Sequence, residues 1–84
     1  MSNAEHLVQM ANDIGHFFAS EPRHADAVAG IANHIQRFWD PRMRSQIMAH
    51  LDRGGDGLED AVREALIRLR ESGAGSTGRA SPSA

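Results

Sequence analysis

HIQRFWDPRMRSQ, residues 34–46, holds the sharpest backbone break of the chain. It contains the only tryptophan of the chain, Trp39, directly before an Asp-Pro dipeptide. Proline disfavours helical geometry in the residue before it. Aspartate is a favoured N-cap, and proline suits the first position of a helix. Asp40-Pro41 therefore ends one helix and begins the next, and the sequence predicts a sharp corner at this point.

Apolar residues recur at steps of three and four on both sides of the corner, which is the period of one helical face. No segment alternates with period two for long enough to form a strand. The sequence therefore predicts an all-α fold, a small bundle of about four short helices. The expected helices cover about residues 3–19, 22–39, 41–52 and 58–70. The residues expected to face inward are Leu7, Met10, Ile14, Phe17, Phe18, Ala25, Val28, Ile31, Ala32, Ile35, Phe38, Trp39, Met43, Ile47, Met48, Leu51, Leu58, Val62, Ala65, Leu66 and Leu69.

The expected helix ends carry capping residues. Ser20 is the predicted N-cap of the second helix. The glycines of DRGGDG, residues 52–57, predict a left-handed C-cap for the third helix, and Asp56 with Glu59 has the form of a capping box for the fourth. Small residues along the second helix, among them Gly30, predict that a neighbouring helix packs closely against it. Caps explain DRGGDG better than a phosphate or calcium loop does, since the P-loop lysine and the EF-hand acidic spacing are missing.

The chain has 84 residues and forms one domain at most. Residues 72–84 consist almost entirely of glycine, serine, alanine and proline and predict a disordered tail. Residues 1–71 remain as a helical domain. A core of this size supplies only roughly 3–5 kcal/mol. We therefore expect a docking domain that is completed by a partner or by self-association.

Composition excludes several classes of function. The chain has no cysteine, which rules out disulfides, thiolate metal ligands and cysteine-ligated iron–sulfur clusters in it. No apolar run approaches the length of a membrane span or has the form of a signal peptide. No serine lies in a G-x-S-x-G turn, and no catalytic triad is recognisable. We therefore expect neither membrane insertion nor catalysis by this chain alone.

Two further functions are possible for a chain of this kind, a metal-binding protein and a helix-turn-helix regulator. The five histidines, His6, His16, His24, His34 and His50, include no pair at helical ligand spacing, which argues against a metal site. Arg42 and Arg44 follow the helix break, as basic residues do in the recognition helix of a helix-turn-helix motif. The net charge of −2 and the Asp-Pro turn, in place of a turn that contains glycine, argue against nucleic acid. The DNA-binding regulator is kept as the alternative function.

Phe38 and Trp39 leave two interpretations open. Adjacent residues of a helix point about 100 degrees apart, so that one can face the core while the other faces outward. Trp39 is either an anchor of the core or a contact for a partner. The small core and the enrichment of tryptophan and arginine at interface hot spots favour the partner contact.

The segment RFWDPRMRSQIMAHLDRGGDGL resembles the delta subunit of the soluble, NAD-dependent, molybdenum-containing formate dehydrogenases of bacteria. LVQMANDIGHFFAS and AVAGIANHIQ upstream share the resemblance, which covers about residues 7–69. It implies a non-catalytic accessory subunit in the cytoplasm that docks on the large catalytic subunit and supports assembly, stability or cofactor maturation. The molybdenum cofactor, iron–sulfur clusters, FMN and NAD are implied on the partner subunits. A permanent subunit and a maturation chaperone both remain open, and no catalytic, cofactor-binding or metal-ligating residue is implied for this chain.

The residues and the resemblance together place a partner-binding surface at the corner. The predicted contact residues are Phe38, Trp39, Arg42, Met43 and Arg44. Asp40 and Pro41 complete the surface by setting the angle between the two helices. The same corner is also expected to allow a homodimer when the partner is absent.

Overall fold

The computed structural model describes residues 3–72, which form four α-helices and no strand. The helices are α1 (Asn3–Phe18), α2 (His24–Phe38), α3 (Pro41–Asp52) and α4 (Asp60–Glu71). The predicted all-α fold class is therefore confirmed. Residues 73–84, and with them nearly all of the predicted tail, lie outside the described residues.

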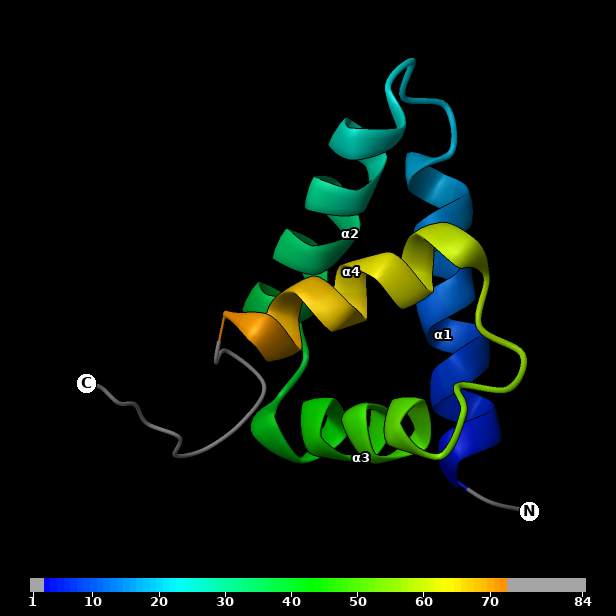
Figure 1. The fold of residues 1–84 in the computed structure, drawn as a ribbon, viewed down its shortest axis with the longest axis vertical. Helices are drawn as coiled ribbons and strands as arrows, with labels where there is room; N and C mark the ends of the chain where they lie inside the picture. Colours follow the sequence, from blue (N-terminus) through cyan, green and yellow to red (C-terminus); the bar gives the residue numbers. More distant parts are fainter. Residues whose placement is uncertain (1–2, 73–84) are drawn as a thin grey trace.

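The four helices form a small bundle (Figure 1). α1 and α2 run side by side in opposite directions, α3 crosses below them, and α4 crosses in front of both. The sequence leads to this arrangement because each helix has one apolar face that must be covered. α4 packs mainly on α2, and α3 packs on α1 and α4.

The core draws side chains from all four helices. Each large apolar side chain that is fully buried contributes roughly 1.5–3 kcal/mol relative to an exposed one. The largest fully buried side chains are Ile31, Ile35, Ile47, Val62 and Leu66. Every one of these was expected to face inward, so the helical periodicity predicted the centre of the core correctly.

Two glycines let the helices approach closely. A Cβ atom at Gly30 would lie 2.5 Å from the ring of Phe18, so the absence of a side chain makes room for that ring. This confirms the close packing predicted for α2. A Cβ atom at Gly15 would lie 2.7 Å from Cγ2 of Val62, which is fully buried. Gly15 thus allows α1 to meet α4.

Near the turn between α1 and α2, two residues expected to face inward lie outward. Phe17 is 76% exposed, because its neighbour Phe18 takes the inward direction and packs edge-to-face against the Phe17 ring at 5.1 Å. Ala25 is exposed near the start of α2, at an open end of the contact with α4. Both residues lie near the turn between α1 and α2, where the neighbouring helices no longer cover every face.

The N-cap predicted for the second helix was wrong. α2 begins at His24 rather than at Pro22, and its N-cap is Arg23, which makes no capping hydrogen bond with its side chain. Ser20 lies in the turn instead, where the N–H of Glu21 donates to the carbonyl of Phe18 at 3.0 Å. Residues 19–23 therefore form the turn that reverses the chain direction before α2 starts.

The connection between α3 and α4 confirms one prediction and corrects another. Gly54, Gly55 and Gly57 all have positive φ angles, as expected of glycines that end a helix. The capping box predicted at Asp56 and Glu59 was wrong, because α4 begins at Asp60 with Glu59 as its N-cap, and the Glu59 side chain makes no capping bond.

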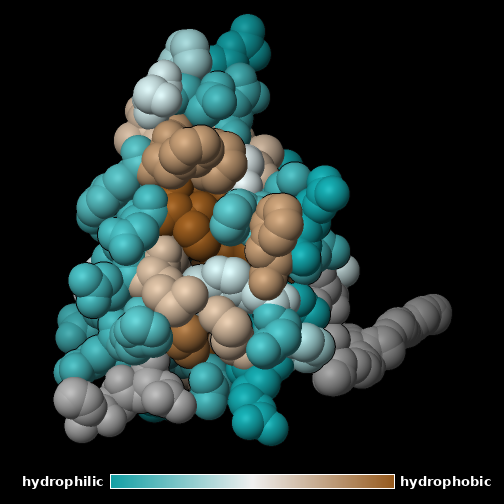
Figure 2. All heavy atoms as spheres, turned by 180° about the vertical axis from the view of Figure 1, so that it is seen from behind, coloured by the Kyte–Doolittle hydropathy of each residue, from teal (hydrophilic) through white to brown (hydrophobic). Residues whose placement is uncertain are grey.

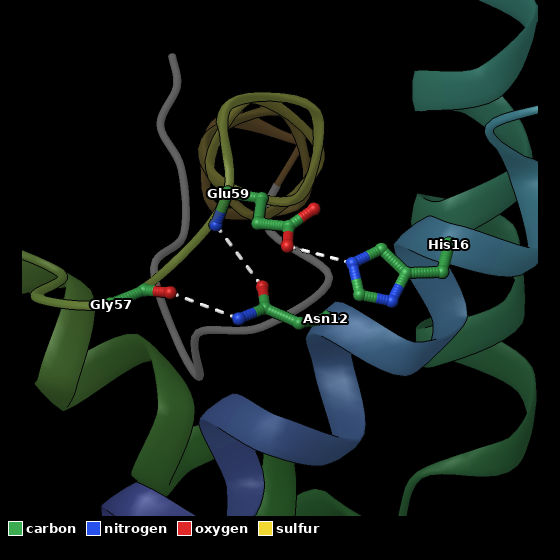
Figure 3. Close-up of polar contacts among 4 residues, drawn as sticks. All are labelled: Asn12, His16, Gly57 and Glu59. Carbon is green, nitrogen blue, oxygen red and sulfur yellow. Dashed lines mark hydrogen bonds and ion pairs between the residues drawn. The ribbon is translucent and has the colours of Figure 1, made fainter.

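Asn12 of α1 replaces the predicted capping box (Figure 3). Its Oδ1 accepts from the N–H of Glu59 at 3.1 Å, and its Nδ2 donates to the carbonyl of Gly57 at 2.9 Å. One amide side chain thereby satisfies the N–H of the N-cap residue of α4 and a carbonyl of the connection that precedes it. The cap comes from a residue 47 positions away in sequence.

Candidate docking site

The corner between α2 and α3 is built as the sequence predicts. Trp39 and Asp40 have extended backbones, and Pro41 is the first residue of α3. The N–H of Trp39 closes α2 on the carbonyl of Ile35 at 3.0 Å. Asp40 Oδ1 accepts from the N–H of Met43 at 2.9 Å, which is an N-cap bond. One dipeptide thus ends α2 and begins α3.

The two aromatic residues of the corner have different environments. Trp39 is only 5% exposed and belongs to the hydrophobic core, whereas Phe38 is 69% exposed. In this structure Trp39 is an anchor of the core. A partner could contact its indole only if the core opened, so the candidate contact surface consists of the neighbours of Trp39.

The exposed Phe38 ring lies among polar and cationic groups. The ring of His34, one helical turn earlier, has its centroid 4.8 Å away and is tilted by 42°. The guanidinium carbon of Arg37 lies 6.0 Å from the centre of the Phe38 ring, at the outer limit of a cation–π contact. Phe38 had been expected to face inward, but the last turn of α2 turns it towards solvent.

Arg44 holds the corner together. Its Nη1 donates to the carbonyl of Trp39 at 2.5 Å and to the carbonyl of Gln36 at 3.2 Å. These are among the last carbonyls of α2, which have no partner within their own helix. The side chain is half-buried as a result. Arg44 therefore acts as a C-terminal cap of α2 rather than as a free cation.

Met43 and Arg42 differ in burial. Met43 is half-buried, packs against the core and lines a hollow of about 360 Å³ together with Leu7 and Met10 of α1. Arg42 is exposed. The predicted surface therefore divides into Phe38 and Arg42, which lie outward, Met43 at an edge, and Trp39 and Arg44, which stabilise the corner.

The outward cations of the corner have no ionic partner within the described chain. The ion pairs among residues 3–72 join His16 to Glu59, His24 to Glu64, and Arg70 to Asp52. Neither Arg37 nor Arg42 belongs to one of them. Both are exposed arginines, and in the sequence Arg37 precedes and Arg42 follows the exposed Phe38.

His16, His24 and His50 make polar contacts with other residues of the fold. His16 Nε2 lies 2.7 Å from Glu59 Oε2 (Figure 3), and His24 Nε2 lies 2.5 Å from Glu64 Oε1. His50 Nε2 donates to the carbonyl of Asp56 at 2.8 Å. Among residues 3–72 there is no group of three or more histidine, cysteine or acidic side chains that could hold a metal ion.

The geometry gives no support to the alternative of a DNA-reading helix. That alternative used Arg42 and Arg44 of α3 as its cations, but the guanidinium of Arg44 is bound to the carbonyls that end α2. Arg42 is then the one arginine of α3 left to contact phosphates. Within the described part of the chain, no helix has the length and apolar character needed to cross a membrane.

Apolar side chains also reach the surface away from the corner. Figure 2 shows the face opposite to that of Figure 1, where they gather over α1 and α2 between hydrophilic borders. Several residues packed around the edge of the core are only half-buried, among them Met10, Ile14 and Phe18 of α1. The two large apolar side chains described as exposed are Phe17 and Phe38. These two residues lie at the ends of different helices.

Comparison of the amino-acid sequence with known protein families finds a match. The family model described as the NADH-dependent formate dehydrogenase delta subunit, FdsD, matches residues 6–66. The matched segment includes all of α2 and α3 and the corner between them. No curated protein and no solved structure matches the chain.

Proposed function

Because this chain belongs to the formate dehydrogenase delta subunit family, we propose that it is a non-catalytic accessory subunit that docks on the large catalytic subunit. The family match over residues 6–66 carries this proposal. Docking supports the assembly, stability or cofactor maturation of the complex. The chain works in the cytoplasm, where the other subunits of the complex fold and receive their cofactors.

The chemistry of the reaction belongs to the partner subunits in this proposal. They bind the molybdenum cofactor, the iron–sulfur clusters, FMN and NAD, while this chain contributes a surface. Two features agree with that division of labour. The chain has no cysteine to ligate a cluster, and a core of this size leaves little room for a deep site that excludes water.

The contact surface of the proposal is the corner between α2 and α3. Phe38 and Arg42 supply the outward contacts, and Met43 adds an apolar edge. Trp39, Asp40, Pro41 and Arg44 set the position of the corner through core packing and hydrogen bonds. Such a division suits docking, since a rigid corner loses little conformational entropy when it binds.

The experiment that tests the function is purification of the tagged full-length chain from its native host. We expect the catalytic subunit in a stoichiometric ratio, identified by mass spectrometry. Metal analysis then separates the two roles: molybdenum and iron in the recovered enzyme indicate a permanent subunit, and recovery of cofactor-free enzyme alone indicates a maturation factor. If neither form of the enzyme is recovered, the proposed function is wrong.

A further inference from the structure

Phe38 occupies a position that the fold of this chain does not require. Its side chain is 69% exposed at the last residue of α2, although the indole directly after it is buried. Burial of an aromatic side chain is the main way in which it stabilises a fold, and Phe38 forgoes most of that gain. Aromatic side chains that are exposed in this way and rigidly held are typical of interface hot spots.

Arg42 occupies a position that is locally unfavourable. It lies in the first turn of α3, which contains no acidic residue. The N-terminus of a helix carries a partial positive charge, so that an acidic side chain is favoured there and a cation is disfavoured. No ion pair within residues 3–72 offsets this cost for Arg42. The carboxylate of Asp40, the N-cap of α3, offsets part of this cost. The part that remains points to a role of Arg42 outside the fold.

The charge of the corner differs in sign from that of the chain. Residues 34–46 carry three arginines and one aspartate, whereas the whole chain carries nine basic and eleven acidic residues. The corner is therefore a positive segment of an acidic protein. With Arg44 bound to the end of α2, and with the exposed Asp40 carboxylate serving as the N-cap of α3, the outward cations are Arg37 and Arg42. Their planar guanidinium groups match the geometry of carboxylates.

From this arrangement we infer that Phe38, Arg37 and Arg42 form one recognition element. Its occupant is a protein surface with an apolar pocket bordered by aspartate or glutamate side chains. Phe38 enters the pocket, and the two arginines on either side pair with the carboxylates. The inference rests on the proposed function, because it describes the surface that the catalytic subunit presents to this corner. Arg37 joins the contact, whereas Trp39, Asp40 and Arg44 are positioning residues behind it.

The test measures binding of the full-length chain to the remaining formate dehydrogenase subunits, purified from a host strain that lacks this chain. Fluorescence anisotropy gives the Kd for the wild type and for five variants, one of which is the double variant Arg37→Gln, Arg42→Gln. Phe38→Ala removes the aromatic ring, while Phe17→Ala makes the same change at a similarly exposed position outside the corner. Arg37→Glu and Arg42→Glu reverse the outward charges. Circular dichroism confirms that each variant is folded.

We expect Phe38→Ala to weaken binding about 30-fold, the effect of a hot-spot residue. Each charge reversal weakens it about tenfold, because an arginine paired with a carboxylate becomes a repelled acid. Phe17→Ala binds like the wild type. The Kd of the wild type rises with salt, and that of the double variant Arg37→Gln, Arg42→Gln rises less steeply.

The possible outcomes distinguish a failure of this inference from a failure of the proposed docking function. If the wild type binds and Phe38→Ala has the same Kd, the inference is wrong and the docking function stands. The same holds if Phe17→Ala raises the Kd as much as Phe38→Ala does. If Arg42→Glu binds as tightly as the wild type or more tightly, the inference that acidic side chains border the pocket is wrong. A wild-type chain that does not bind the other subunits overturns the proposed function, and the inference with it.

Discussion

Phe38 and Trp39 are adjacent in sequence, yet Phe38 is 69% exposed and Trp39 is 5% exposed. The backbone is extended at Trp39 and at Asp40, the residue that Pro41 keeps out of helical geometry, and the Trp39 indole lies in the core just after Phe38 has ended α2 on the outside. Structural and contact roles are thereby assigned to neighbouring residues. The two roles can be separated experimentally by single substitutions.

Stability should depend on Trp39 and not on Phe38. Trp39→Ala leaves a cavity in the core and should lower the free energy of unfolding by about 3–5 kcal/mol. That is comparable with the whole stability expected of a core of this size, so this variant should be largely unfolded. Phe38→Ala should change the free energy by no more than about 0.5 kcal/mol. Urea denaturation followed by circular dichroism measures both, and equal losses would contradict the division of roles.

The two arginines of α3 should affect stability in opposite directions. Arg44→Ala removes the hydrogen bonds to the carbonyls of Gln36 and Trp39, and should cost about 1–3 kcal/mol. Arg42→Glu places an acid in the first turn of α3, and should stabilise the chain by about 0.3–1 kcal/mol. Thermal unfolding of the two variants at low salt tests this. If Arg44→Ala unfolds like the wild type, its capping role is refuted.

The start of α4 should depend on Asn12 and not on Asp56. Asn12→Ala leaves the N–H of Glu59 and the carbonyl of Gly57 without their partner, and should cost about 1–2 kcal/mol. Asp56→Ala is the matched control and should change stability by less than about 0.5 kcal/mol. Chemical denaturation of both variants gives the answer. A larger loss for Asp56→Ala would restore the capping box that the sequence predicts.

Self-association of the isolated chain through the corner should be weak. A homodimer through the corner remains a prediction from the small size of the core, but a two-fold interface there would bring Arg37 and Arg42 of each copy close to the same residues of the other. Like charges at such short range oppose association. Sedimentation velocity at increasing concentrations tests this expectation. A dimer that Phe38→Ala dissociates would show that the corner covers itself when no partner is present.

The parts of this fold that local chemistry determines could be predicted from the sequence. The bounds of α3 agree with the prediction because Asp40-Pro41 begins it and a glycine pair ends it. Contacts between distant segments could not be predicted in this way. Asn12 caps α4 across 47 positions of sequence, and Gly15 meets Val62 only because α1 and α4 cross there.

The candidate site could be located from the sequence but not resolved into its parts. The unusual segment from Phe38 to Arg44 indicated the corner. Because adjacent side chains of a helix point in different directions, one of the two aromatic residues could be expected to face outward. Which of the two does so depends on where the core lies, a property of all four helices together. The role of Arg44 likewise depends on the path of the backbone, which brings the last carbonyls of α2 within its reach.

Photo-crosslinking in the native host tests the docking account most directly. The crosslinking amino acid p-benzoylphenylalanine is introduced at Phe38 in one strain and at Phe17 in another, so that two similarly exposed aromatic positions are compared. The account predicts that irradiation joins the chain to the large catalytic subunit from position 38 and not from position 17. A crosslink to that subunit from position 17, with none from position 38, would contradict it.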